Sequence, residues 1–190
     1  MKYILSLALV IFSTFIFSNT AQAQNFEVDY GQSKIGFSGT HAGNEFEGVF
    51  NEWNAAIFFD RETPKESEIT ASFKAASAQT GNKMYDGTLP EADWFDAKNH
   101  EAILFESTKI ARKEGNTYSA TGDLTIRGIT KPISFDFTLT DLDNDQVKVN
   151  ANFVIDRLAY DIGKKSDAKA EWVSQNIDMT LELIATPKAQ

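Results

Sequence analysis

The side chains that could carry out chemistry are few in this chain of 190 residues. Its two histidines, His41 and His100, lie far apart and form no HxH or HExxH spacing, and cysteine is absent. A transition-metal site needs such side chains in clusters, so the sequence predicts no metal site and no metal cofactor. The absence of cysteine also excludes thiol catalysis and disulfide exchange.

The acidic run DLDND at residues 141–145 is a candidate calcium-binding loop. Its acids stand at the first, third and fifth positions of a calcium loop, but Gln146 replaces the glycine and Asn152 the bidentate glutamate. An acidic hairpin turn fits better. No GxSxG motif is present, and nothing selects one carboxylate pair for acid–base work. We therefore expect no catalytic residues, no cofactor and no enzyme.

The elements around these residues follow a period of two. Apolar residues alternate with polar ones from Phe26 to Leu183, which predicts eight to nine antiparallel strands with no βαβ rhythm. A sandwich and an up-and-down barrel both fit such a pattern. Gly48 and Gly122 share faces with phenylalanines, as a curved barrel interior requires, and leave room inside. We expect an all-β, antiparallel barrel of eight strands or so, wide enough for one small ligand.

Residues 80–96, TGNKMYDGTLPEADWFD, interrupt the strands. A turn, a short helical segment near residues 82–95 and the pair Trp94 and Phe95 predict a lid over an apolar cavity. The charged residues 157–171 fit a loop or short helix. The fifteen phenylalanines must be buried somewhere. They could fill the barrel or line a cavity, and their pattern alone leaves both readings open.

The N-terminus resembles an export signal. Lys2, an apolar run and the small-residue site ending at Ala23 predict a signal peptide over residues 1–23 and one mature domain over residues 24–190. We expect a periplasmic or secreted protein. The formal charge of −9 and the lack of a basic cluster argue against nucleic-acid binding and leave only transient membrane contact. A homodimer, paired through a strand edge or the barrel mouth, stays open.

Several stretches in a fixed order resemble the YceI-like family of exported polyisoprenoid-binding proteins, across nearly the whole mature chain. They are residues 33–60 (SKIGFSGTHAGNEFEGVFNEWNAAIFFD), 80–96, 103–110 (ILFESTKI), 118–137 (YSATGDLTIRGITKPISFDF), 156–163 (DRLAYDIG) and 173–185 (VSQNIDMTLELIA). The sequence departs from the family pattern at Tyr85, where an arginine is usual, and at Thr88. These departures concern the ligand's head group.

The resemblance implies a lipocalin-like barrel that sequesters or carries a long isoprenoid, either a polyprenyl lipid or a quinone tail. The alternative is a packed barrel with a stress or interaction role and no ligand. The candidate tail-binding residues are Phe37, Phe46, Phe50, Phe73, Phe105, Phe135, Phe137, Phe153, Leu89 and Trp94. The candidate head-group residues are His41, Asn82, Asp86 and Arg127.

Overall fold

A computed structural model describes residues 24–188; the expected signal peptide, residues 1–23, lies outside the described residues, as do residues 189–190. Strands dominate the described chain. They are β1 (Gln24–Val28), β2 (Lys34–His41), β3 (Asn44–Phe50), β4 (Trp53–Phe59), β5 (Glu68–Lys74), β6 (Ala78–Gln79), β7 (Ala102–Arg112), β8 (Thr117–Ile126), β9 (Ile129–Asp141), β10 (Val147–Asp156) and β11 (Asn176–Pro187). The helices are α1 (Lys83–Thr88) and the 3-10 turns η1 (Pro64–Glu66), η2 (Ala75–Ser77) and η3 (Arg157–Tyr160).

Eight of the strands close into an antiparallel barrel, which confirms the expected fold. Their order around the wall is β1-β4-β5-β7-β8-β9-β10-β11, and β1 pairs with β11 to complete the circle. Every neighbouring pair is antiparallel. Since a closed barrel leaves no open edge on these strands, the alternating apolar side chains have one enclosed interior to face.

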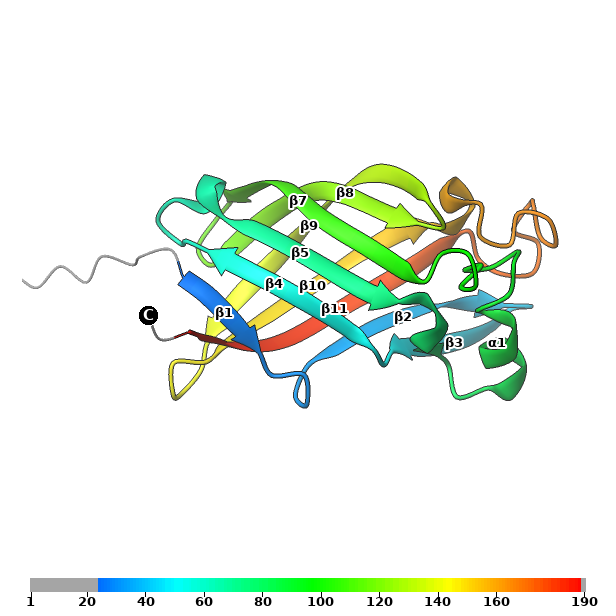
Figure 1. Cartoon of the computed structure of the whole chain (residues 1–190), viewed down its shortest axis with the longest axis horizontal. Helices are drawn as coiled ribbons and strands as arrows, with labels where there is room; N and C mark the ends of the chain where they lie inside the picture. The colour runs from blue at the N-terminus through cyan, green and yellow to red at the C-terminus, as the bar shows by residue number, and fades with distance from the viewer. Residues whose placement is uncertain (1–23, 189–190) are drawn as a thin grey trace, which may run out of the picture.

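The wall has an extension at one end of the barrel. Strand β11 pairs with β1 through residues 185–187 and with β2 through residues 178–182, and β2 leads on to β3 and β6. In Figure 1 this extension lies beside α1, at the end that also carries the loop after η3, whereas β1 begins and β11 ends at the opposite end. We call these the lid end and the far end.

The inward face of β7 cannot be read from its sequence alone. The run Ile103, Leu104 and Phe105 is apolar throughout, but Ile103 and Phe105 are buried while Leu104 is 47% exposed. The register shifts between Ser107 and Lys109, which is a β-bulge that changes the parity of the strand. Ile110 therefore points inward as well.

Two inward glycines are covered by neighbouring rings and do not leave space. A Cβ atom on Gly48 would lie 2.2 Å from Cζ of Phe37, and one on Gly122 would lie 2.7 Å from Cζ of Phe105. Ordinary carbon contacts are about 3.5–4.0 Å. The expectation that these glycines hold the cavity open is therefore wrong: they let the phenylalanine of the adjacent strand lie flat against the wall.

Replacing Gly48 with alanine tests this packing. We expect Gly48→Ala to lower the free energy of unfolding by about 1–3 kcal/mol, because the methyl group displaces the Phe37 ring. Gly36→Ala, in the same strand pair, is the control, since its Cβ would lie 3.6 Å from the carbonyl oxygen of Gly48. Denaturant unfolding of both variants measures the difference, and equal stabilities would contradict the packing described.

Candidate ligand-binding cavity

An apolar cavity runs inside the barrel between its two ends. Its wall includes Leu89 and Trp94 from the lid segment and Phe26 and Phe59 near the far end. Among the described residues that line it, Arg157 is the only one with a charged side chain. The interior therefore offers van der Waals contact to a ligand but almost no hydrogen bonding, which suits a hydrocarbon.

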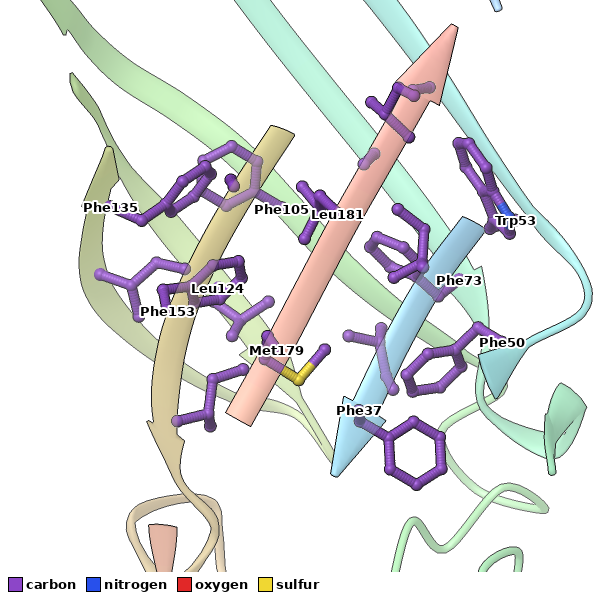
Figure 2. Close-up of a pocket in the computed structure, with 18 of the residues that line it drawn as sticks. Phe37, Phe50, Trp53, Phe73, Phe105, Leu124, Phe135, Phe153, Met179 and Leu181 are labelled. Carbon is purple, nitrogen blue, oxygen red and sulfur yellow. The ribbon is translucent and has the colours of Figure 1, made fainter. Parts of the chain in front are cut away.

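All ten candidate tail residues line this cavity. They are Phe37, Phe46, Phe50, Phe73, Leu89, Trp94, Phe105, Phe135, Phe137 and Phe153. The labelled rings form two groups, seen around Met179 and Leu181 of β11 in Figure 2. In one group, Phe50 lies 5.4 Å from Phe37 and 5.6 Å from Phe73 between ring centroids. In the other, Phe135 stacks on Phe153 at 4.5 Å. Their binding of a ligand stays a prediction.

The volume of the cavity is small in this structure. It is about 210 Å³, and a cavity of about 150 Å³ in another protein holds one benzene. An isoprene unit is close to benzene in size, so roughly one or two units fit without any side-chain movement. A longer tail needs the half-buried rings, such as Phe73 and Phe153, to change rotamer.

The lid segment, residues 80–96, is held in place by its own sequence. Asn82 begins α1 as an N-cap, since its side chain accepts a hydrogen bond of 3.0 Å from the N–H of Met84. The helix ends at Thr88, before Leu89, and turns follow up to Asp96. The expected helical segment is therefore confirmed, but it is shorter than residues 82–95. From the lid end, the cavity is lined by Leu89, Trp94 and Phe95.

Three of the four polar candidates lie at the lid and bond to protein atoms. His41 Nδ1 lies 2.8 Å from the hydroxyl of Tyr85, the residue that replaces the family's arginine. The carboxylate of Asp86 accepts hydrogen bonds from the N–H and hydroxyl of Thr80, at 2.6 and 2.8 Å. Asn82 is used as the cap. None of these three residues lines the cavity.

Arg127, the fourth polar candidate, links the lid to the loop after η3. Its guanidinium donates to the carbonyl oxygens of Ala92, at 2.8 Å, and of Asp161. It does not line the cavity either. A head-group role for these four residues stays a prediction, and in this structure their polar atoms hold the lid.

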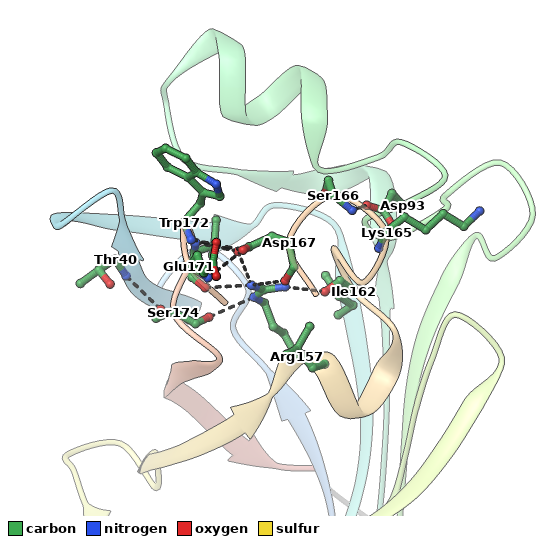
Figure 3. Close-up of polar contacts among 12 residues, drawn as sticks. Thr40, Asp93, Arg157, Ile162, Lys165, Ser166, Asp167, Glu171, Trp172 and Ser174 are labelled. Atoms are coloured by element: carbon green, nitrogen blue, oxygen red, sulfur yellow. Dashed lines mark hydrogen bonds and ion pairs between the residues drawn. The ribbon is translucent and has the colours of Figure 1, made fainter. Parts of the chain in front are cut away.

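The charged residue that sequence reasoning missed is Arg157, at the start of η3. Its side chain is 2% exposed and forms an ion pair of 2.6 Å with Asp167, itself 5% exposed. It also donates to the carbonyl oxygens of Ile162 at 2.7 Å, Val173 at 2.8 Å and Ser174 at 3.0 Å (Figure 3). It lies in the charged segment 157–171 and was not singled out from the sequence; its position in the stretch 156–163, which resembles the family, is the signal that could have found it.

Asp167 completes this cluster from the other side. Its carboxylate accepts hydrogen bonds from the backbone N–H groups of Glu171 at 2.8 Å and Val173 at 2.9 Å. Burial opposes ionisation, but the N–H groups, with Val173 first, and the charge of Arg157 outweigh it and hold the pKa of Asp167 below its ordinary value. The carboxylate form of Asp167 is thus favoured, and its contacts with Arg157 and with the backbone fix the loop around the pair.

Asp93 joins the lid to the same loop. Its carboxylate accepts the N–H groups of Lys165 at 2.9 Å and Ser166 at 2.8 Å. Burial again opposes ionisation, but hydrogen bonds, chiefly from Ser166, and the charge of Arg127 together lower the pKa of Asp93. The second half of the lid is therefore anchored more firmly than α1, whose side-chain link to the barrel strands is the His41–Tyr85 hydrogen bond.

The acidic run at residues 141–145 forms the turn between β9 and β10, as expected. Within residues 24–188, no group of three or more histidine, cysteine, aspartate or glutamate side chains is arranged to hold a metal ion. The described helices include none that is both long and apolar enough to span a bilayer.

The sequence profile of the YceI-like domain matches residues 26–185. The chain belongs to the YceI-like family. Among curated relatives, a UPF0312 protein of Photorhabdus laumondii is 34% identical over 119 residues, which cover 61% of this chain and 62% of that protein. One from Ectopseudomonas mendocina is 28% identical over 67% of this chain and 69% of its own. The match therefore spans less than two thirds of the Photorhabdus protein.

Solved structures share the barrel. BcnA of Burkholderia cenocepacia superposes with a TM-score of 0.80 at 28% identity, over 84% of this chain and all (100%) of that chain. A polyisoprenoid binding domain from Saccharophagus degradans superposes with a TM-score of 0.67 at 13% identity, over 86% of this chain and 98% of that one. The second likeness concerns the fold alone.

The ion pair predicts how the protein responds to acid. Because the folded pKa of Asp167 is lowered, its stabilising contribution is present above the unfolded value of about 3.9 and is lost as pH falls through the folded pKa. At neutral pH we expect Asp167→Ala to lower the free energy of unfolding by about 3–5 kcal/mol, since it leaves Arg157 buried without its partner.

Urea unfolding at neutral pH and across the acid range measures both effects. The expected result is that Asp167→Ala is less stable at neutral pH and loses less further stability on acidification than the unmodified protein. Asp143→Asn, in the exposed turn after β9, is the control for removing a carboxylate. Parallel stability curves for Asp167→Ala and the unmodified protein would contradict this account.

Proposed function

We propose that this protein is an exported carrier that holds the isoprenoid tail of a polyprenyl lipid or quinone inside its barrel. The observation that carries the proposal is the lining of the cavity, where every described side chain except Arg157 is apolar. Such a wall gives no positions for acid–base or metal chemistry, so the function is binding without a reaction. The lid segment, residues 80–96, controls access.

The physical strength of such binding comes from the tail alone. Removing about ten methylene groups from water contributes about 8 kcal/mol at ~0.8 kcal/mol each, which corresponds to a micromolar dissociation constant. A longer tail gains more contact but must turn cavity rings such as Phe73 and Phe153, and that rearrangement offsets part of the gain. No charged contact with the head group is needed for this affinity.

The comparisons support this proposal at the level of the family. The Saccharophagus degradans domain, described as polyisoprenoid binding, shares the barrel in which this chain places its ten aromatic and aliphatic candidates. At 13% identity, the likeness supports the architecture of the site, and the choice of ligand rests on the apolar wall of this chain. A quinone and a polyprenyl lipid share the tail and differ at the head.

Export is part of the proposal and rests on residues 1–23, which match a cleavable signal. Because the chain contains no cysteine, the exported protein needs a fold that is stable without the disulfides that many exported proteins use. A closed barrel with a continuous β-ladder meets that need.

Mass spectrometry of an organic extract of the natively purified protein tests the ligand. We expect an isoprenoid or quinone in stoichiometric amount, and uptake of added fluorescent prenyl analogues by the emptied protein. Ala71→Phe should weaken uptake by about tenfold or more, because Ala71 lines the cavity and the added ring occupies space for about two methylenes.

Ala56→Phe is the matched control, since Ala56 is exposed on the neighbouring strand β4. It adds the same ring outside the barrel and should leave uptake unchanged. An empty extract together with no uptake of any prenyl analogue would refute tail binding and favour a packed barrel with an interaction role.

Cell fractionation with N-terminal sequencing tests export. We expect the protein outside the cytoplasm, with a mature chain that begins at Gln24. Replacing Ala21 and Ala23 with bulky residues should block processing, because signal peptidases require small side chains there. An unprocessed protein that stays in the cytoplasm would contradict the proposed location and would leave the binding proposal untouched.

A further inference from the structure

The far end of the barrel carries a second hollow that the proposed carrier function does not use. Its volume is about 270 Å³, and half of the described residues that line it are polar or charged, namely Gln24, Arg61, Asp141, Asp145 and Gln146. It lies where the loop after β4 approaches the turn between β9 and β10, and Arg61 from that loop forms an ion pair with Asp141 at the end of β9. The hollow therefore lies at the end opposite the lid, close to the outer surface.

Of residues 24–188, three have side chains that line both hollows. Phe26 on β1, Phe59 on β4 and Val147 on β10 line the apolar cavity on one side and the far-end hollow on the other. We call these three residues the end wall. They come from three different strands and each is apolar, so the end wall separates an almost wholly apolar cavity from a hollow that also contains charged side chains.

The three residues differ in how firmly they are held. The ring of Phe59 is 6% exposed and contacts Tyr118 at 5.1 Å and Phe137 at 6.1 Å between centroids. Val147 is 8% exposed, and Phe26 is half-buried in the short strand β1. Phe59 and Val147 thus belong to the same packed core, and Phe26 packs against it from a half-buried position. Truncating Val147 removes fewer buried atoms than truncating Phe59, and Phe26 is less buried, so both can be made smaller at lower cost to folding.

We propose that the end wall of Phe26, Phe59 and Val147 sets the longest isoprenoid tail that the barrel accepts. This inference rests on the proposed tail binding and on the tail entering from the lid end. A tail that grows along the cavity gains contact until its last unit meets the end wall. Beyond it lie the Arg61–Asp141 ion pair and the far-end hollow near the outer surface, where a further hydrocarbon unit gains less apolar contact than inside the barrel.

The test uses a series of prenyl alcohols, namely geraniol, farnesol, geranylgeraniol and solanesol. Their affinities are measured by displacement of a fluorescent prenyl probe. For the unmodified protein we expect affinity to rise along the series and then to stop rising before solanesol. Each further buried methylene is worth about fourfold in affinity, so the point at which the rise stops is readily measured.

Two variants truncate a side chain of the end wall and so extend the cavity toward the far end, Val147→Ala and Phe26→Ala. We expect each to bind solanesol about tenfold more tightly than the unmodified protein, because a few more methylenes find apolar contact, and to bind geraniol within about twofold of it. Val147→Phe thickens the end wall and should move the limit to a shorter alcohol. Since this variant removes no buried group, it keeps the test informative if a shortened variant folds poorly.

Phe58→Ala is the matched control. Phe58 precedes Phe59 on β4 and pairs with Asn25 beside Phe26, but it does not line either hollow. It should leave the limit unchanged, and thermal unfolding of every variant confirms folding.

The outcomes separate the two proposals. Unchanged length dependence in all three end-wall variants would overturn the end wall's role while leaving tail binding intact. Failure of the unmodified protein to bind any of the alcohols would refute the proposed function and the end wall's role together. If the longest alcohol that still gains affinity becomes longer with Val147→Ala and shorter with Val147→Phe, the role of the end wall in setting tail length is established.

Discussion

The buried ion pair between Arg157 and Asp167 is the interaction on which the lid end depends. The loop after η3 is organised from within, because Arg157 donates to three of its carbonyl oxygens and Asp167 accepts from its N–H groups. The lid contacts the same centre through Trp94, whose ring lies 5.8 Å from the guanidinium. Such a pair is stable in a low-dielectric site only when all its hydrogen bonds are made, and here the loop supplies them.

Gly163 shows how closely the loop and lid approach each other. Its φ of +70° lies in the left-handed region, and a Cβ there would be 2.7 Å from Nη1 of Arg157 and 3.4 Å from Trp94. Its N–H also donates to the carbonyl oxygen of Asp93 at 2.6 Å. Strand β2 joins the assembly where the N–H of Ala42 donates to the carbonyl oxygen of Trp172. Lid, loop and wall therefore form one connected rim.

The sequence predicts the barrel well because its signal is local and repeated. Each inward residue, such as those at 133, 135 and 137 in β9, is separated from the next by one outward residue, and closure follows once every strand needs a covered face. The short helix that interrupts the strands and the acidic turn after β9 were likewise predictable from the sequence. The parity of β7 was not, since a bulge is a one-residue change in pairing that depends on the partner strand.

The candidate site was predictable in its apolar part only. An inward phenylalanine on a strand of the wall or of its extension points to the interior, so all eight phenylalanine candidates reach the cavity wall, and Leu89 and Trp94 reach it from the lid segment. The polar candidates lie at the end of β2, in or beside α1 and in the turn after β8, where the direction of a side chain depends on tertiary hydrogen bonds that spacing does not encode. Arg157 was missed for that reason, and Gly48 was misread because the ring that covers it belongs to another strand.

An apolar cavity without polar partners has a consequence for how a carrier works. A tail taken from a bilayer is already out of water, so moving it into the barrel exchanges one hydrocarbon environment for another and the net drive is small. Discrimination between ligands must then come from shape, from the ends of the cavity and from the cost of turning its rings. Small net drive also means that the ligand leaves as readily as it arrives. In the proposed carrier, whose tail enters at the lid end, the rim built on Arg157 would therefore govern the rate of exchange more than its equilibrium.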